Sequence, residues 1–216
     1  MAEKPEVVIR PFNSADREAV RKISCETSFL GENRRRFFDD DILADALTIY
    51  FTDYEPQSSF VAQADQKVIG YIIGAKDAKK MQPIMASKII PQIIIKSWRK
   101  GLLYQPHNLN FFWSILISAF KGEFWMPPLE KTYPAILHIN IYRDFRAQNV
   151  GTRLMEAYLN YLKQNHIPGV YLGTVSEQAK KFFVKSGFSL LFRKRRTYLK
   201  YHLGREFYFY IFAKSL

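Results

Sequence analysis

The chain has 216 residues and a formal net charge of +12 at pH 7, and 48% of its residues are apolar. This length and composition predict one domain over residues 1–216 with a sizeable core, and they exclude a generally disordered chain. The single cysteine, Cys25, excludes an intramolecular disulfide, and the four histidines are scattered without metal-ligand spacing, so we expect no metal site.

The sequence also carries signals about location and partners. Its start, MAEKPEVVIR, lacks the apolar core of a secretory signal, and the longest apolar run, Phe111 to Phe120, is well short of the ~20 residues of a spanning helix. We therefore expect a cytoplasmic protein. The positive charge leaves nucleic acid, an anionic membrane, or an anionic cofactor and substrate open as partners, beside an ordinary basic surface.

The first third of the chain alternates between strand and helix patterns. Asn13 or Ser14 is a suitable helix cap, and apolar residues recur at helical spacing after it and again after Asp39. The expected elements are a strand at 7–10, a helix to about Glu26, a helix at 39–50, and a hairpin of strands 59–64 and 68–74 around a turn at 65–67.

An aromatic-rich segment follows, at about 76–133, in which lysines and arginines are interleaved with apolar residues. Apolar residues recur at helical spacing at 85–98 and at 109–120. The simplest interpretation is two helices that pack on the domain. The alternatives are a lid over a substrate, a homodimer surface, or an amphipathic element on a membrane surface.

The most informative part of the sequence is AILHINIYRDFRAQNVGTRLMEAYLNYLKQ, in which a strand pattern, a polar turn and a helix pattern follow one another. It begins with a strand at 135–141, which places apolar residues on one face and His138 and Asn140 on the other. A polar turn at 142–149 follows, and a helix with an apolar stripe begins at Val150.

A strand, a loop with a glycine and a helix in this order suit phosphate binding, because the first N–H groups of a helix have no intrahelical partners. Arg146 adds a charge and a fork of donors, and Gly151 permits close approach of the backbone. Asn149 is a residue type that tolerates a left-handed conformation. An arginine in such a loop is commonly just solvated, so this pattern alone is a weak signal.

The end of the chain predicts a further strand and helix and a final strand pair. The expected elements are a strand at 170–174, a helix at 177–186, and an antiparallel pair at 188–193 and 207–212. Gly187 is placed to cap the helix at its C-terminus. The basic run at 193–196 is interpreted as a solvated segment between the last two strands.

Two segments of the second half resemble one known family. RAQNVGTRLMEA resembles the acyl-CoA loop of the GNAT N-acetyltransferase superfamily, R/Q-x-x-G-x-G/A, with Arg146 first, Asn149 in place of one glycine, and Gly151 last. SEQAKKFFVKSGF resembles the family segment N-E-x-A-x-x-F-Y-x-x-x-G-F, and the two have the family's order and separation. LHIN is also similar to a strand in acetyltransferase-like domains related to the one fused to some O-GlcNAcases.

The resemblance implies an α/β (α+β) fold with a mixed, mostly antiparallel central sheet flanked by helices. In that fold the strand at 135–141 and the strand at 170–174 splay apart, and the acyl-pantetheine of acetyl-CoA lies in the gap. The segment at 76–133 is then a helical insertion between the hairpin and the cofactor strand.

The resemblance also implies which residues hold the cofactor. The backbone of the splayed strand docks pantetheine and polarises the thioester carbonyl, and the start of the next helix holds the pyrophosphate. Ser176 takes the place of an asparagine and keeps a hydrogen-bonding hydroxyl. The expected cofactor-binding residues are Ile139, Ile141, Arg146, Ala147, Gln148, Asn149, Val150, Gly151, Thr152, Ser176 and Phe183.

His138 is the candidate general base, because a neutral imidazole can accept a proton near physiological pH. Asn140, on the same strand face, could orient the substrate. A histidine buried against the core, or stacked on a neighbour, is an equally good interpretation of this residue. A base that acts through water is a third option.

The general acid is where the chain departs from the family, because Phe183 replaces the tyrosine that protonates the leaving thiolate. Tyr171 or water would serve instead, or turnover is slow or absent. We expect an acetyl-CoA-dependent N-acetyltransferase, an acyltransferase that acts on a small-molecule or peptide amine by direct attack in a ternary complex. The alternatives are a non-catalytic CoA-binding module and a membrane-surface or nucleic-acid-binding protein.

Overall fold

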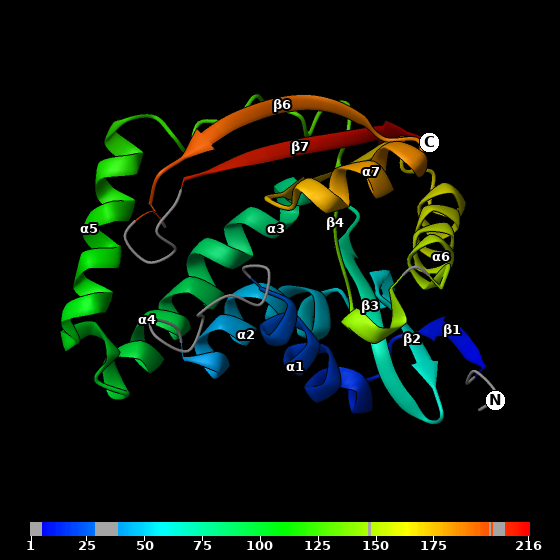
Figure 1. Cartoon of the computed structure of the whole chain (residues 1–216), viewed down its shortest axis with the longest axis horizontal. Helices are drawn as coiled ribbons and strands as arrows, with labels where there is room; N and C mark the ends of the chain where they lie inside the picture. Colours follow the sequence, from blue (N-terminus) through cyan, green and yellow to red (C-terminus); the bar gives the residue numbers. More distant parts are fainter. Residues whose placement is uncertain (1–5, 29–38, 147, 199, 201–205) are drawn as a thin grey trace.

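A seven-stranded mixed sheet forms the centre of the part of the chain that is described (Figure 1). The computed structural model describes residues 6–28, 39–146, 148–198, 200 and 206–216. Paired strands are antiparallel, except that β4 and β5 are parallel. The strands are β1 (Val7–Pro11), β2 (Phe60–Ala64), β3 (Lys67–Ala75), β4 (Ala135–Ile141), β5 (Gly169–Thr174), β6 (Ser189–Arg196) and β7 (Phe207–Ser215), in the spatial order β1-β2-β3-β4-β5-β7-β6.

Helices cover both faces of this sheet. The helix α6 packs on one face through Leu154, Tyr158 and Leu162, and α1 packs on the other through Val20 and Ile23. The helices are α1 (Arg17–Thr27), α2 (Asp40–Ile49), α3 (Ala78–Ile84), α4 (Ile90–Arg99), α5 (Pro106–Phe120), α6 (Val150–Gln164) and α7 (Glu177–Lys185).

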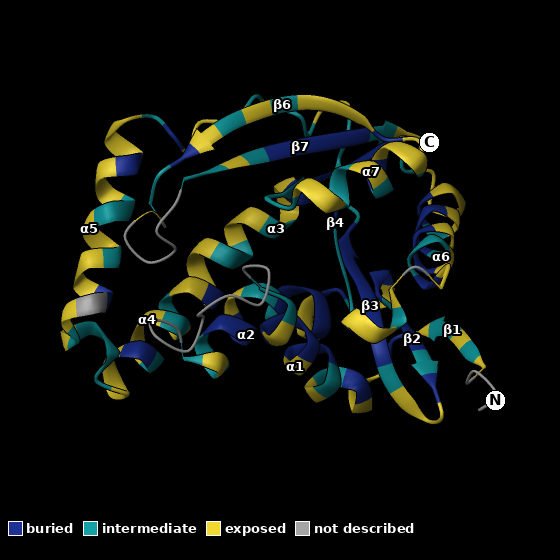
Figure 2. Ribbon diagram, viewed as in Figure 1, coloured by how far each residue is buried: buried dark blue, intermediate teal, exposed yellow. Residues whose placement is uncertain are grey.

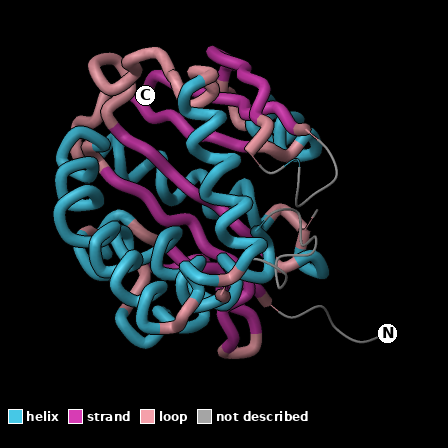
Figure 3. Tube along the Cα trace, turned by 90° about the vertical axis from the view of Figure 1, so that its left-hand side faces the viewer, coloured by secondary structure: helices cyan, strands magenta, loops and turns pink. Residues whose placement is uncertain are grey.

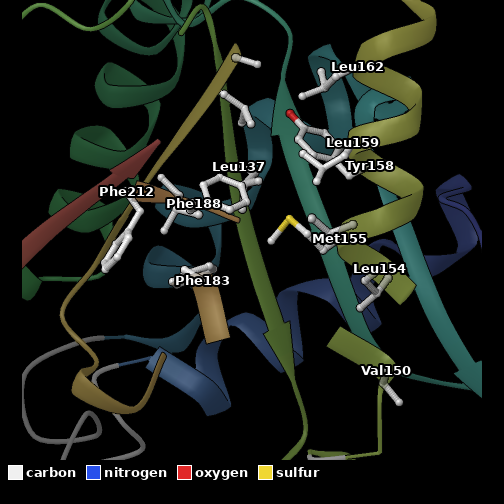
Figure 4. Close-up of a cluster of buried hydrophobic side chains, with 14 of the residues drawn as sticks. Leu137, Val150, Leu154, Met155, Tyr158, Leu159, Leu162, Phe183, Phe188 and Phe212 are labelled. Atoms are coloured by element: carbon white, nitrogen blue, oxygen red, sulfur yellow. The ribbon is translucent and has the colours of Figure 1, made fainter. Parts of the chain in front are cut away.

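Successive side chains of the central strands point to opposite faces of the sheet, and they contribute to two separate hydrophobic clusters. In β4, Leu137 points into the cluster under α6, which Figure 4 shows, and Ile136 packs against the cluster under α1. In β3, Ile72 belongs to the first cluster and Tyr71 and Ile73 to the second. The sheet is therefore buried on both faces at its centre, as the apolar runs of these strands require.

The fold class expected from the sequence is confirmed, and the predicted elements are present with small shifts of their bounds. Gly187 has a φ of 81°, and its N–H donates to the carbonyl of Val184 at 3.0 Å. It therefore ends α7 in the left-handed conformation that favours glycine. Asp39 caps α2 through its side chain, which accepts the N–H groups of Asp41 and Ile42.

The basic run at 193–196 is a correction. It forms the end of β6 rather than a link between the last two strands. Arg193 and Arg195 are exposed, as predicted, whereas Arg196 is only 4% exposed. Its guanidinium lies 4.9 Å from the ring centre of Phe124 and 5.1 Å from that of Phe209. Aromatic faces and strand pairing thus bury a charge that the sequence pattern places in solvent.

The helical insertion between β3 and β4 is also confirmed, although its first part is longer than predicted. The helix expected at 85–98 is preceded by α3 and reaches α4 through a π-helical turn, Met85–Ile89. Pro91, in the first turn of α4, has no N–H to donate to a carbonyl one turn earlier, which loosens the helix there.

Ion pairs dock α4 on α2. Asp45 of α2 accepts from Lys96 at 2.5 Å and also from Arg21 of α1, and both the Asp45 and Arg21 side chains are largely buried. Lys100 at the end of α4 lies 2.8 Å from Asp39. The insertion is therefore attached to the domain through paired charges as well as apolar contacts.

Candidate functional site

The parallel strands β4 and β5 separate after a short paired stretch. Only Ala135 with Val170 and Ile136 with Tyr171 are paired, whereas the other edge of β4 stays paired with β3 as far as Ile141. The β5-facing edge of β4 from Leu137 to Ile141 therefore has peptide groups available to an amide-bearing ligand.

The start of α6 offers backbone donors next to this gap. Asn149 precedes the helix with φ 62° and ψ 4°, and its side chain makes no capping hydrogen bond. The N–H groups of Val150, Gly151 and Thr152 have no partner among the described residues, and the first helical bond is from Arg153 to Asn149 at 3.1 Å. These donors and the positive end of the helix suit an anion.

The space over Gly151 is narrow. A Cβ at this position would lie 3.3 Å from Cδ1 of Ile141, at the end of β4, and 3.3 Å from the ring of Phe182 on α7. The helix start thus meets the end of the splayed strand and the neighbouring helix at one point. A glycine keeps its backbone reachable by a pyrophosphate, so the residues present fit that group.

The loop between β4 and α6 is held by its own polar side chains. Nε of Arg146 donates to the carbonyl of Ile141 at 3.1 Å, which sets the exposed guanidinium beside the mouth of the gap. The amide of Gln148 donates to the carbonyl of Asp144 at 2.8 Å. Ala147, another predicted cofactor residue, lies outside the described residues.

The two α7 residues expected at the cofactor occupy different environments. The hydroxyl oxygen of Ser176 caps α7 by accepting the N–H of Ala179 at 3.2 Å, and its hydroxyl proton is left for a ligand. Phe183 is 5% exposed and its ring packs against Phe188 and Phe212 (Figure 4). The adjacent Phe182, which the sequence analysis did not select, is the residue that faces Gly151.

As predicted, His138 and Asn140 share one face of β4; α1 packs on this face, and both residues are partly exposed. The imidazole of His138 packs edge-on against Phe51, with 5.5 Å between ring centres, and burial lowers its pKa to about 4. It is therefore neutral at pH 7 but weakly basic. The amide of Asn140 donates to the hydroxyl of Tyr71 at 2.7 Å.

The phenols near the gap are engaged in packing. Tyr171, the predicted alternative acid, lies where β4 and β5 are still paired, and burial raises its pKa to about 12, with a contribution from Glu130. Tyr210 of β7, which the sequence analysis missed, is 2% exposed and donates to Glu177 at the start of α7. The hydroxyl of Tyr210 is thus paired with a carboxylate, and Tyr171 is 8% exposed.

Among the described residues no group of three or more histidine, cysteine, aspartate or glutamate side chains is arranged to hold a metal ion. Within the same residues, no helix combines the length and the apolar character needed to cross a membrane.

Comparison with known proteins agrees with this geometry. The model of the acetyltransferase (GNAT) family matches residues 19–188. This chain therefore belongs to the GNAT acetyltransferase family.

Solved structures share the fold over nearly the whole chain. SsHAT aligns with a TM-score of 0.70 at 23% identity, covering 98% of both chains. The Drosophila melanogaster polyamine N-acetyltransferase, which forms N-acetylagmatine, aligns with a TM-score of 0.59 at 15% identity, covering 98% of this chain and 100% of its own. The Salmonella typhimurium protein yncA, solved with its cofactor acetyl-CoA, gives 0.59 at 11% identity, covering 98% and 94%.

Proposed function

We propose that this chain is an acetyl-CoA-dependent N-acetyltransferase that works by direct attack of an amine in a ternary complex, with residues 1–216 as one domain. The observation that carries the proposal is the contact between the start of α6 and the end of β4. Gly151 is one of three residues whose N–H groups have no described partner, and a Cβ at this position would lie 3.3 Å from Ile141. A diphosphate and the amide-bearing arm attached to it would meet both features at once.

The cofactor supplies an acetyl thioester, and the chain supplies its binding and orientation. The N–H groups of Val150, Gly151 and Thr152, with the guanidinium of Arg146, hold the pyrophosphate. Peptide groups on the free edge of β4, at Ile139 and Ile141, hold the pantetheine and polarise the thioester carbonyl. The hydroxyl of Ser176 donates a further hydrogen bond.

The acceptor amine approaches from the β4 face that carries His138 and Asn140. Its nitrogen forms a bond to the acetyl carbon as the carbon–sulfur bond breaks, and one amine proton must leave. We assign His138 as the group that accepts a hydrogen bond from this amine. Because its pKa is about 4, the proton passes on to water rather than staying on the imidazole.

We assign protonation of the leaving thiolate to water as well. Phe183 has no acidic proton to donate. Tyr171 and Tyr210 are both buried, and the hydroxyl of Tyr210 already donates to Glu177. A thiol has a pKa of about 8.5, so its anion is a tolerable leaving group without a positioned acid.

The acceptor class that fits this chemistry is a primary amine, as in the polyamine acetyltransferase whose fold this chain shares.

A two-stage experiment tests the proposal. Thermal shift of the purified chain with acetyl-CoA, CoA or buffer measures binding, and thiol release across a panel of primary amines then measures transfer. We expect stabilisation by both nucleotides and release with at least one amine. Absence of any stabilisation at millimolar ligand would contradict the cofactor site.

The second candidate function is a CoA-binding module without chemistry, which the buried phenylalanine at position 183 favours. It predicts the same thermal stabilisation without thiol release for any amine. The two stages of the experiment therefore separate the two functions.

A further inference from the structure

The insertion between β3 and β4 exposes an unusual amount of apolar surface. The three tryptophans of the protein, Trp98, Trp113 and Trp125, all lie in it and are each more than half exposed. Most of the exposed large apolar side chains among the described residues fall between Ile90 and Met126. A soluble domain seldom leaves aromatic surface of this extent without an occupant.

The helix α5 has its apolar side facing outward. Its solvent-exposed residues recur at helical spacing and form one stripe along the helix, here called the α5 stripe. The stripe consists of Leu109, Phe112, Trp113, Leu116, Ile117 and Phe120, of which Phe120 is 92% exposed.

The opposite side of α5 packs against the rest of the protein. The ring of Phe111 lies 6.2 Å from that of Tyr198, and the hydroxyl of Ser118 lies 3.4 Å from that of Thr197. Asn108, at the boundary between the two sides, is buried and donates to the carbonyl of Leu102. At 100° per residue, Phe111 and Ser118 are on the far side of the helix from the α5 stripe.

The α5 stripe therefore lies at the outer end of the molecule, away from the acetyl-transfer site. In Figure 1, α5 stands at the left edge, whereas α6 and β1 lie at the right, and Figure 2 shows exposed residues along α5. Figure 3 turns this end of the molecule toward the viewer. The stripe covers no part of the gap between β4 and β5.

The charges around the α5 stripe are basic. Residues 76–133 contain nine lysines and arginines and three aspartates and glutamates, and α5 itself carries no charged residue. The exposed Arg99 precedes α5, and the exposed Lys121 follows it. An apolar stripe that contains Trp113 and is followed and preceded by basic residues suits the interface of an anionic lipid bilayer, where indole rings and cationic side chains are favourable.

We propose that the α5 stripe docks the protein on an anionic membrane surface, with α5 lying in the plane of the interface. A second copy of the chain fits less well, because an antiparallel pair of α5 helices would place Arg99 of each copy near Lys121 of the other. Like charges at both ends oppose that pairing, whereas phosphatidylserine head groups neutralise them.

Flotation of the full chain with vesicles tests this proposal. We expect it to float with phosphatidylcholine vesicles that contain about 30% phosphatidylserine and to float weakly with pure phosphatidylcholine. The variant with Trp113→Glu and Phe120→Glu should bind at least about tenfold more weakly, because both side chains lose insertion into the interface. Arg99→Glu with Lys121→Glu should reduce the binding and its sensitivity to salt.

The matched control is Val184→Glu on α7, which changes another exposed apolar residue that is outside the insertion. It should float like the original protein, and circular dichroism verifies that each variant is folded. Two results would overturn the proposal. One is no flotation with anionic vesicles at low salt. The other is that sedimentation velocity shows a dimer for the original protein and a monomer for the variant with Trp113→Glu and Phe120→Glu. Both readouts are independent of acetyl transfer.

Discussion

The hydroxyl of Tyr158 occupies the space that a side chain at Gly74 would need. A Cβ at position 74 would lie 2.1 Å from this oxygen and 2.6 Å from the carbonyl of Ile136. The same hydroxyl donates to that carbonyl at 2.9 Å. Since Ile136 pairs with both Ala75 and Tyr171, the contact fixes α6 over the last paired residues of β4 and β5, just before the strands separate.

We predict that Gly74→Ala lowers the free energy of unfolding by about 1–3 kcal/mol, because a methyl group in this contact forces Tyr158 or the sheet to move. Tyr158→Phe, which only leaves the carbonyl of Ile136 without this donor, should cost about 1 kcal/mol. Urea denaturation of the two variants measures both values. An unchanged midpoint for Gly74→Ala would show that the contact relaxes freely.

Two substitutions test the predicted pyrophosphate site at the start of α6. One replaces a glycine and the other introduces a glycine. Gly151→Val should weaken acetyl-CoA binding at least about tenfold, since its branched side chain would meet Ile141 and Phe182. Asn149→Gly is the matched control. Position 149 has a φ of 62°, which glycine adopts without strain, so this variant should keep its affinity. Isothermal calorimetry measures both, and equal affinities would place the pyrophosphate elsewhere.

The sequence predicts the central part of the fold well because its signals are local. The hairpin at β2 and β3, the capping residue Gly187 and the alternation in β4 each follow from residues within a few positions of one another. The two segments that resemble GNAT motifs then predict how these elements assemble. The family match and the early separation of β4 from β5 confirm that assembly.

Other features depend on contacts between distant segments, and no local pattern contains them. The low pKa of His138 arises from its burial beside Phe51, which comes from the segment after α2. Arg196 is buried because Phe124 and Phe209 enclose it. The outward direction of the α5 stripe likewise becomes visible only when Thr197 and Tyr198 are placed against the other side of α5.

The titration of His138 gives a prediction about stability and pH. Its pKa is about 4 in the folded protein against 6.5 in the unfolded chain, so protonation favours unfolding. Stability from neutral His138 is fully present above about pH 6.5 and is lost as the pH falls to about 4. This loss is about 3 kcal/mol at most, and solvent screening reduces it.

His138→Phe keeps an aromatic ring against Phe51 and removes the titration. We expect the free energy of unfolding to vary less between pH 6.5 and pH 4 than in the original protein. The same His138→Phe variant should release thiol about tenfold more slowly, and an unaltered rate would remove His138 from proton transfer.

The ion pairs around α1, α2 and α4 should differ in strength with burial. Asp45→Asn removes the carboxylate that Arg21 and Lys96 share in a largely buried position, so we expect a loss of about 3 kcal/mol. Asp53→Asn breaks the pair with Arg17, whose two side chains are about one-third exposed, and should cost about 0–1 kcal/mol. Urea denaturation compares the two. Equal losses would show that burial does not govern these pairs.

Phe183→Tyr restores the residue that serves as the acid elsewhere in the family, and it tests whether water protonates the thiolate here. Phe183 packs against Phe188 and Phe212 and is 5% exposed. A hydroxyl placed among these rings has no ready partner, so the free energy of unfolding should fall by about 1–3 kcal/mol. Thiol release per folded molecule should stay unchanged, because the new hydroxyl is held inside the core. A rise of about tenfold in the rate of thiol release would instead show that the side chain at position 183 reaches the sulfur, and that the lack of a positioned acid limits turnover in the original protein.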